Sequence, residues 1–387
     1  MDFEAQRIIE ALRSGIPSRI IGGRFSFART ELLAELSEWL EAEEGGGRII
    51  TANYGEGKTH LLGTVFNMAR SKNMAVSMLS LSKETPMNQP HVIYQKIAHN
   101  TYLPSREQPG FESLLGQLGQ AESLDLQVYA AKGLQTDKLF FLLRAFANTD
   151  NPEYKFSMQA DLHGDFLPNA QLKKVYGEIF GEKISFSANF AKTRHIDDYY
   201  RFVRRLFDLS GLNGWVILFD EAEYIGRLGR KSRLKAYANM EKFLKPEYKN
   251  IHSLFAMHAS YAKEVIEGKD EWKGLQDSEG IDKDAAGDTL TRIETAQELL
   301  PLTSEELSEV ITRILDFHAR AYGWTPGITA AELFEAARTR GHLLRTKIRA
   351  AIEYLDQLLQ YGEADSITTG ELDLVEYVEE IPLPEDL

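Results

Sequence analysis

Residues 49–60 have the sequence IITANYGEGKTH, in which an apolar run is followed by a turn that carries two glycines and ends in Gly-Lys-Thr. Two glycines let successive backbone N–H groups point to one centre, and a helix that begins at Lys58 adds its positive dipole end. Lys58 is expected to reach the β- and γ-phosphates of a nucleotide, and the Thr59 hydroxyl is expected to bind Mg²⁺. The stretch therefore predicts a phosphate-binding loop after a buried strand. The candidate nucleotide-binding residues are Asn53, Tyr54, Gly55, Glu56, Gly57, Lys58, Thr59 and His60.

One position departs from the pattern G-x-x-x-x-G-K-[ST], because Ala52 occupies the place of the first glycine. Alanine disfavours a positive φ, so we expect either a negative φ at this position or a slightly different first turn. A chance glycine-rich turn is the alternative interpretation. The apolar strand before the loop and the helical pattern LLGTVF at 61–66 favour the phosphate loop.

A second motif follows about 160 positions later, where the apolar run WVILF at 215–219 ends in Asp220 and Glu221. A continuous apolar run is typical of a strand buried on both faces, and open parallel sheets bind ligands at the carboxyl ends of their strands. We expect Asp220 to hold Mg²⁺ and Glu221 to polarise the attacking water. The two motifs together predict a site for a magnesium-bound nucleotide.

Further strands are expected at 75–81, at 251–257 and around 292–302. The second of these ends near His258 and Ser260, either of which could sense the γ-phosphate, although a capped strand end explains them equally well. The predicted fold class is α/β, with a P-loop NTPase parallel sheet and flanking helices.

The pattern along the chain predicts three parts: an ATPase core at 1–300, a small helical lid domain at 301–361 and an acidic tail at 362–387. The core includes helices at 2–14 and 27–44, a helix at 91–102 and a helical insertion at about 104–196. Residues 16–29 either contact the base of the nucleotide or form a helix that only packs against the core. The last helix carries Arg345 and Arg349 near its start, where an arginine could swing over the phosphates or serve only as surface charge.

The chain has 387 residues, of which 43% are hydrophobic and 26% charged, a composition that predicts a soluble protein with one large or two moderate cores. The absence of cysteine excludes disulfides and thiolate zinc sites and favours a cytoplasmic location, and we expect no signal peptide and no membrane span. The net charge of −14 is concentrated in the tail, which has nine acidic residues and no Lys or Arg.

A basic stretch follows Glu221. It is either a solvated helix face or a contact surface for DNA, RNA or a neighbouring subunit's nucleotide. Its members are Arg227, Arg230, Lys231, Arg233, Lys235, Lys242, Lys245 and Lys249.

With these parts in order, the chain resembles AAA+ ATPases of the initiator and loader type and, more narrowly, the BREX-type phage-defence P-loop ATPases of the BrxC/BrxD family. The resemblance rests on EALRSGIP at 10–17, FARTELLAEL at 27–36, GRIITANYGEGKTHLL at 47–62, GWVILFDEAEYI at 214–225 and RIETAQELLPLTSEEL at 292–307. It implies that Arg292, before the last strand, acts on a neighbour's ATP, and that Arg345 is the small-domain arginine, with Arg349 as the alternative.

The expected function is an Mg-ATP hydrolase with catalytic roles for Lys58, Glu221, His258, Arg292 and Arg345. The resemblance implies a motor or switch in an antiviral system, an oligomer that works with double-stranded DNA and with protein partners such as a helicase or methyltransferase. The alternative is an adaptor that binds ATP as a structural ligand and hydrolyses it negligibly.

Overall fold

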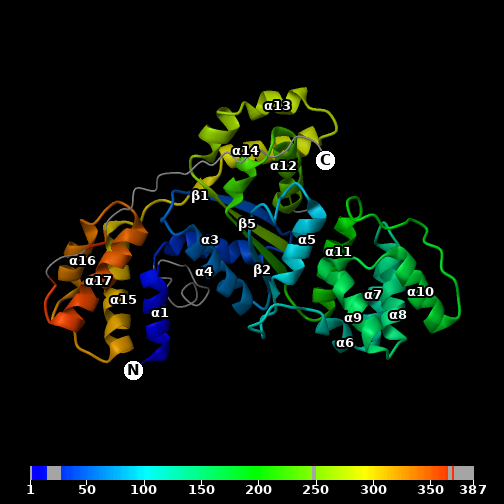
Figure 1. Cartoon of the computed structure of the whole chain (residues 1–387), viewed down its shortest axis with the longest axis horizontal. Coiled ribbons are helices and arrows are strands. Elements are labelled where there is room, and N and C mark those ends of the chain that lie inside the picture. The colour runs from blue at the N-terminus through cyan, green and yellow to red at the C-terminus, as the bar shows by residue number, and fades with distance from the viewer. Residues whose placement is uncertain (1, 15–27, 246–249, 365–367, 370–387) are drawn as a thin grey trace. The chain divides into compact units, whose positions relative to one another are not determined.

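The computed structural model describes residues 2–14, 28–245, 250–364 and 368–369 (Figure 1). The chain divides into two compact units. The larger spans Pro17–Pro301, and the smaller combines Met1–Ile16 with Leu302–Leu387.

The larger unit is built on a six-stranded sheet, counted over the described residues, with the order β3-β2-β4-β5-β1-β6. All neighbours are parallel except β2 and β3, so the carboxyl ends of the main strands share one edge. The strands are β1 (Gly46–Ala52), β2 (Ala75–Ser80), β3 (Thr101–Tyr102), β4 (Trp215–Asp220), β5 (Ile251–His258) and β6 (Gln297–Glu298).

Helices cover both faces of this sheet, because the central strands are apolar on both sides. In β4, Val216 and Leu218 pack with α3 (Thr30–Glu41) and α4 (Lys58–Ser71). Trp215, Ile217 and Phe219 pack on the opposite face. The helices of that face are α5 (Pro90–His99), α11 (Ile196–Leu209), α12 (Arg230–Leu244) and α14 (Lys283–Glu294).

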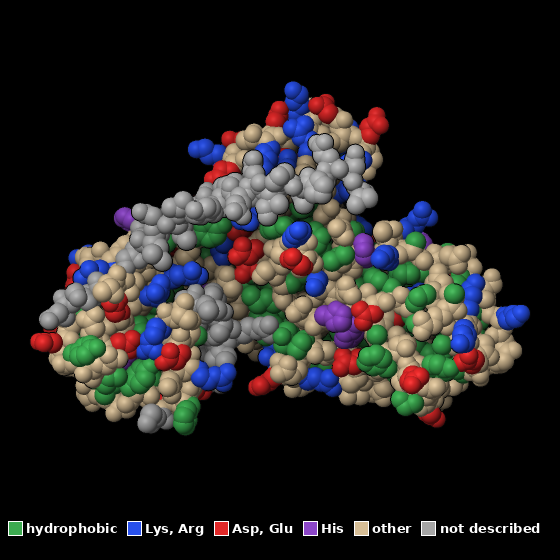
Figure 2. All heavy atoms as spheres, in the orientation of Figure 1, with side chains coloured by type: hydrophobic (Ala, Val, Ile, Leu, Met, Phe, Trp, Pro, Cys, Tyr) green, Lys and Arg blue, Asp and Glu red, His purple; other side chains and the backbone are tan. Residues whose placement is uncertain are grey.

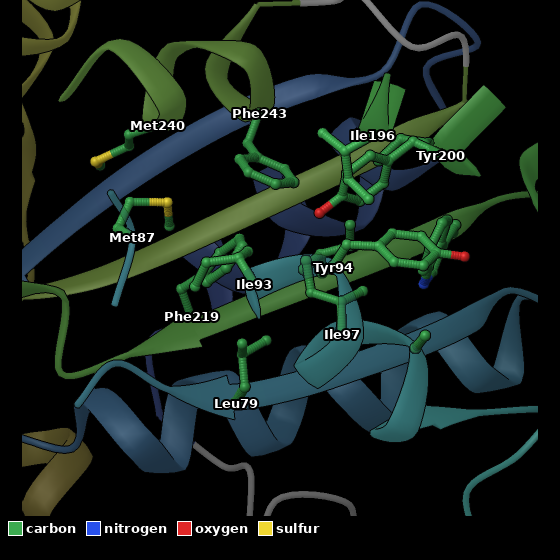
Figure 3. Packing of buried hydrophobic residues seen from close by; sticks show 14 of the residues in the cluster. Leu79, Met87, Ile93, Tyr94, Ile97, Ile196, Tyr200, Phe219, Met240 and Phe243 are labelled. Atoms are coloured by element: carbon green, nitrogen blue, oxygen red, sulfur yellow. The ribbon is translucent and has the colours of Figure 1, made fainter. Parts of the chain in front are cut away.

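Figure 3 shows part of this second face, where Tyr94 of α5, Tyr200 of α11 and Phe243 of α12 lie among apolar side chains over the strands. Strand β1 and helix α12 approach closely at Gly47, where an added Cβ atom would lie 2.6 Å from the Phe243 carbonyl oxygen. Gly47 is therefore required for close packing.

The expected insertion is helical, as the sequence predicts, and lies between β3 and α11 (Figure 1). It has a small apolar core of its own around Leu142, Met158, Leu172 and Tyr176. Its elements are α6 (Ser113–Gln117), α7 (Gln120–Lys132), α8 (Lys138–Ala147), α9 (Pro152–Ala160), the π-helical turn η1 (Asp161–Asp165) and α10 (Asn169–Phe180). Short elements η2 (Ala222–Arg227), η3 (Ala262–Glu267) and α13 (Glu271–Asp277) complete this unit.

The smaller unit contains α1 (Phe3–Ser14), α15 (Ser304–Tyr322), α16 (Ala330–Arg338) and α17 (Leu344–Tyr361). The sequence placed residues 2–14 with the core, but α1 packs against α15 and α17. Arg13 binds both carboxylate oxygens of Asp356 on α17, with N–O distances of 3.0 and 2.7 Å, and also donates to Tyr322 at 3.0 Å. The apolar face of α1 is thus buried by helices far from it in sequence.

Two expected elements differ in the structure. The strand expected around 292–302 is limited to Gln297–Glu298, because residues 283–294 form α14. The helix expected at 91–102 ends at His99, and Thr101–Tyr102 form β3 instead.

None of the helices in the described part of the chain is both long and apolar enough to cross a membrane. Of the acidic tail expected at 362–387, residues 365–367 and 370–387 lie outside the described residues.

Candidate functional site

The phosphate loop joins the carboxyl end of β1 to the amino end of α4. Gly55 and Gly57 have φ values of 77° and 97°, which only glycine adopts without strain. Ala52, in contrast, is the last residue of β1 and is not among the residues with positive φ. The alanine in place of the first glycine is therefore accommodated by extended backbone, the first of the two possibilities that the sequence left open.

Lys58 is buried within this loop. Its Nζ donates to the carbonyl oxygens of Ala52 and Asn53, at 2.9 and 3.3 Å, and lies 5.0 Å from the centre of the Tyr54 ring. Burial lowers the pKa of Lys58, while the nearby carboxylate of Glu223 opposes this shift. The ammonium group is thus held at the base of the cradle that backbone N–H groups form.

The two motifs meet at the sheet edge. The Thr59 hydroxyl donates to the Asp220 carboxylate at 2.7 Å, although the residues are 161 positions apart. Glu221 follows in a left-handed conformation (φ 56°, ψ 36°), is exposed, and donates its N–H to the other Asp220 oxygen at 2.9 Å. The predicted juxtaposition of Thr59 and Asp220 is therefore present.

A hydroxyl and a carboxylate oxygen at this spacing suit Mg²⁺, which takes oxygen ligands and few protein side chains when phosphates are present. Among the described residues, no group of three or more His, Asp or Glu forms a separate metal site. Thr59 and Asp220 are thus the residues that could hold the ion.

The other loop residues surround this centre. Glu56 is buried, and its N–H donates to the Asn53 carbonyl at 3.4 Å. His60 lies in the first turn of α4 and accepts the Thr64 hydroxyl at its carbonyl oxygen, at 3.1 Å.

His258 lies where the sequence placed it, at the carboxyl end of β5, and β5 lies between β1 and β4. It is opposite Ala52 in the strand register, and its ring is 4.5 Å from the ring of Tyr54. Its Nδ1 is 2.8 Å from the Ser260 hydroxyl. A polar ring therefore lies next to the phosphate loop.

Glu223 is a site residue that the sequence reasoning missed. Burial raises the pKa of its carboxyl group, and no donor in the described residues reaches its buried Oε2. The motif DEAE at 220–223 contains it, but its closeness to Lys58 depends on the turn η2, which returns the side chain towards the loop.

Arg292 lies on α14 and not directly before a long strand. Its Nε is 3.4 Å from Glu241 in the last turn of α12. Since α12 leads into the amino end of β5, this pair lies towards the edge of the sheet opposite the phosphate loop. A role on a neighbour's nucleotide stays a prediction.

Arg345 and Arg349 are both exposed in the first turns of α17, four positions apart and hence on one face of that helix. They belong to the smaller unit, and their role stays a prediction.

The basic stretch is smaller than the sequence suggested. Arg233 is buried against Glu271 (Nε–Oε1 2.9 Å), Lys242 pairs with Asp197 at 2.9 Å, and Lys245 pairs with Asp288 at 2.9 Å. Figure 2 shows Lys and Arg intermingled with Asp and Glu around α13, at the top of the view. The exposed remainder is Arg227, Arg230, Lys231 and Lys235, and Lys249 lies outside the described residues.

A parallel sheet with a phosphate loop after β1 and an Asp-Glu pair after β4 defines a P-loop protein of the α/β class. A family model described as "BREX system ATP-binding protein BrxC/D" matches residues 2–138 and 191–368, most of the chain. The chain belongs to this family. Residues 139–190, which contain most of α8 and all of α9, η1 and α10, lie outside the match.

Among solved structures, a Walker-type ATPase of Pyrococcus abyssi matches with 14% sequence identity and a TM-score of 0.37, over 87% of this chain and 69% of that chain. This similarity is too distant to assign roles to residues. No curated protein matched the sequence.

Proposed function

We propose that this ATP-binding protein of the BREX family is an Mg²⁺-dependent ATP hydrolase whose nucleotide state controls its assembly with DNA and with protein partners. The observation that carries the proposal is the hydrogen bond between Thr59 and Asp220 beside the buried ammonium of Lys58. Structural adaptors can bind ATP without such an arrangement, whereas phosphoryl transfer depends on positioned cations around the phosphates.

Each side chain has a defined task in this proposal. Lys58 moves from the carbonyls of Ala52 and Asn53 to the β- and γ-phosphates, which offer charged acceptors. Thr59 and Asp220 hold Mg²⁺, and the ion neutralises charge on the phosphates when bound. Glu221 orients the attacking water, and His258 reports the presence of the γ-phosphate.

Substitution at Lys58 and Glu221 tests the chemistry. Lys58→Ala is expected to weaken Mg-ATP binding at least about a hundredfold, since it removes a charge from a buried phosphate site. Glu221→Gln is expected to bind ATP with near wild-type affinity but to lower kcat by about a hundredfold or more. Calorimetry measures binding, and phosphate release measures turnover.

The matched control is Lys72→Ala, which removes a lysine just beyond the other end of the same helix, where it pairs with Glu41. This variant is expected to leave the affinity for Mg-ATP and kcat unchanged. Full turnover in the Glu221→Gln protein would exclude the role proposed for that carboxylate.

ATP turnover by the wild-type protein, measured with and without double-stranded DNA, distinguishes the hydrolase from the adaptor. Zero turnover in both conditions would favour an adaptor. Particle mass measured with a non-hydrolysable ATP analogue, again with and without duplex DNA, tests the proposed assembly.

A further inference from the structure

Arg29 lies immediately before α3 and reaches across the phosphate loop. Its backbone is left-handed (φ 60°, ψ 40°), a conformation that costs free energy for a side chain other than glycine. Its Nη2 donates to the Glu56 carbonyl oxygen at 2.9 Å, and its Nη1 lies 3.3 Å from the position of a Cβ atom added to Gly57. One guanidinium therefore lies against two residues of the loop.

The same nitrogen binds a second, distant segment. Arg29 Nη2 donates to the carbonyl oxygen of Leu300 at 3.0 Å. Leu300 is followed by Pro301, the last residue of the larger unit, and the chain then enters the smaller unit at Leu302. The guanidinium thus joins the phosphate loop to the segment through which the chain leaves the larger unit.

This exit segment, residues 297–301, is also attached to the strand that leads into the loop. Strand β6 pairs with Ile50 and Thr51 of β1, and the Leu299 N–H donates to the Thr51 carbonyl at 2.7 Å. Leu299 is buried, whereas the Leu300 side chain is 66% exposed. Beyond Leu299, the hydrogen bond from Arg29 to the Leu300 carbonyl is therefore a further restraint on the exit segment within the larger unit.

We propose that Arg29 is a positioning residue that couples occupancy of the phosphate loop to the exit segment. Phosphate oxygens form stronger hydrogen bonds with a guanidinium than neutral carbonyls do, so a nucleotide in the loop competes for Arg29. When the guanidinium turns to the nucleotide, Leu300 loses its donor and the exit segment is less restrained. A ligand shifts such an equilibrium only because it binds the two arrangements differently. This inference rests on ATP binding at the loop.

Hydrogen exchange of the amides of residues 297–300, with and without Mg-ATP, tests the coupling. In the wild-type protein, ATP is expected to speed exchange of these amides by at least about threefold, because a local restraint is released. Arg29→Met keeps the apolar stem but removes the donors. In this variant the segment is expected to exchange fast without ATP and to show no further increase with ATP.

Two further variants test whether the ATP response depends on the Arg29 guanidinium. Arg29→Lys keeps the charge without the planar fork and is expected to restore part of the ATP response. Arg48→Met removes an arginine of β1 that contacts Glu35 and Trp39, and it is expected to keep the full response.

The inference is overturned if ATP causes no increase in the wild-type protein, or if Arg29→Met shows the same increase. Calorimetry on the same samples separates the causes. Failure of the wild-type protein to bind ATP would remove the proposed function as well, whereas intact binding with an unresponsive exit segment removes only the role of Arg29.

Discussion

Glu223 is one of four carboxylates whose charges act on Lys58, together with Asp220, Glu221 and Glu56, and its effect is the largest of the four. Burial is the main cause of its raised pKa, since a carboxylate away from water is disfavoured in its charged form. A negative charge at this position repels a polyanion while it attracts the lysine. Glu223 is therefore expected to limit the affinity for ATP.

We predict that Glu223→Gln binds Mg-ATP more tightly at pH 7.5, by about threefold to tenfold, because one nearby negative charge is removed. Because the pKa of Glu223 is raised, its carboxylate is protonated at a higher pH than an ordinary glutamate. The difference in ATP affinity between the variant and the wild-type protein is therefore expected to shrink as the pH falls. Calorimetric titrations from about pH 5 to pH 8 measure both effects.

The control for this variant is Glu267→Gln, which removes an exposed carboxylate on η3. Equal or weaker ATP binding by the Glu223→Gln protein across the whole pH range would contradict the prediction.

The insertion is connected to α11, a helix that covers the sheet, by a buried polar cluster between α8, η1 and α11. Lys138 donates to Asp161 at 2.5 Å and to the Tyr199 hydroxyl at 3.1 Å, and Tyr199 donates to Asp161 at 2.6 Å. All three side chains are fully buried. Lys138 also lies 4.5 Å from the ring centre of Phe190. Such a cluster specifies one arrangement of helices, because each member needs the others to satisfy its charge or hydrogen bond.

Lys138→Met is predicted to destabilise the larger unit by about 3–5 kcal/mol, since it leaves the Asp161 carboxylate buried without its cation. Adding Asp161→Leu to this variant is predicted to recover a large part of the loss. Urea denaturation followed by circular dichroism measures the difference.

Lys155→Met, on the exposed side of α9, provides the comparison and is expected to change stability by less than about 0.5 kcal/mol. A loss below about 1 kcal/mol in the Lys138→Met protein would show that the cluster is not needed for stability.

Each of the two units has buried apolar residues of its own, and within the larger unit the two faces of the sheet and the insertion form separate apolar clusters. His252 is a buried titratable group of the central strand β5, next to both β1 and β4. Its Nε2 is 3.0 Å from the Ala42 carbonyl oxygen, and the Trp39 ring packs against its ring in a T-shaped arrangement. Burial lowers the pKa of His252 to about 4.

This pKa predicts a loss of stability in mild acid. Below about pH 6.5 the unfolded chain binds a proton at His252, whereas the folded protein binds it only below about pH 4, so unfolding is favoured as the pH falls between these values. Relative to His252→Gln, the wild-type protein is predicted to lose about 2 kcal/mol of unfolding free energy between pH 7 and pH 5.

The measurement is the difference in urea unfolding free energy between the two proteins at each pH. His342→Gln, an exposed histidine of the smaller unit, is expected to show no such dependence. A pH-independent difference for His252→Gln would contradict the buried neutral state.

The local features of the site were predictable from the sequence, because each depends on residues that are close along the chain. Glycines at 55 and 57 impose the loop, and an apolar run ending in Asp220 specifies a buried strand whose acids face the sheet edge. The α/β class, the helical insertion and the position of His258 follow from the same local patterns.

Only the tertiary structure decided the partners of these residues. No local pattern specifies which segments of the chain approach one another. Three contacts depend on such an approach: Arg292 with Glu241, Glu223 with Lys58, and Arg29 with Leu300. Helix α1 likewise looks like any amphipathic helix until α15 and α17 bury its apolar face. The physical reason is that periodicity and turn chemistry act over a few residues, whereas the partner of a charge or an apolar face is chosen by packing of the whole chain.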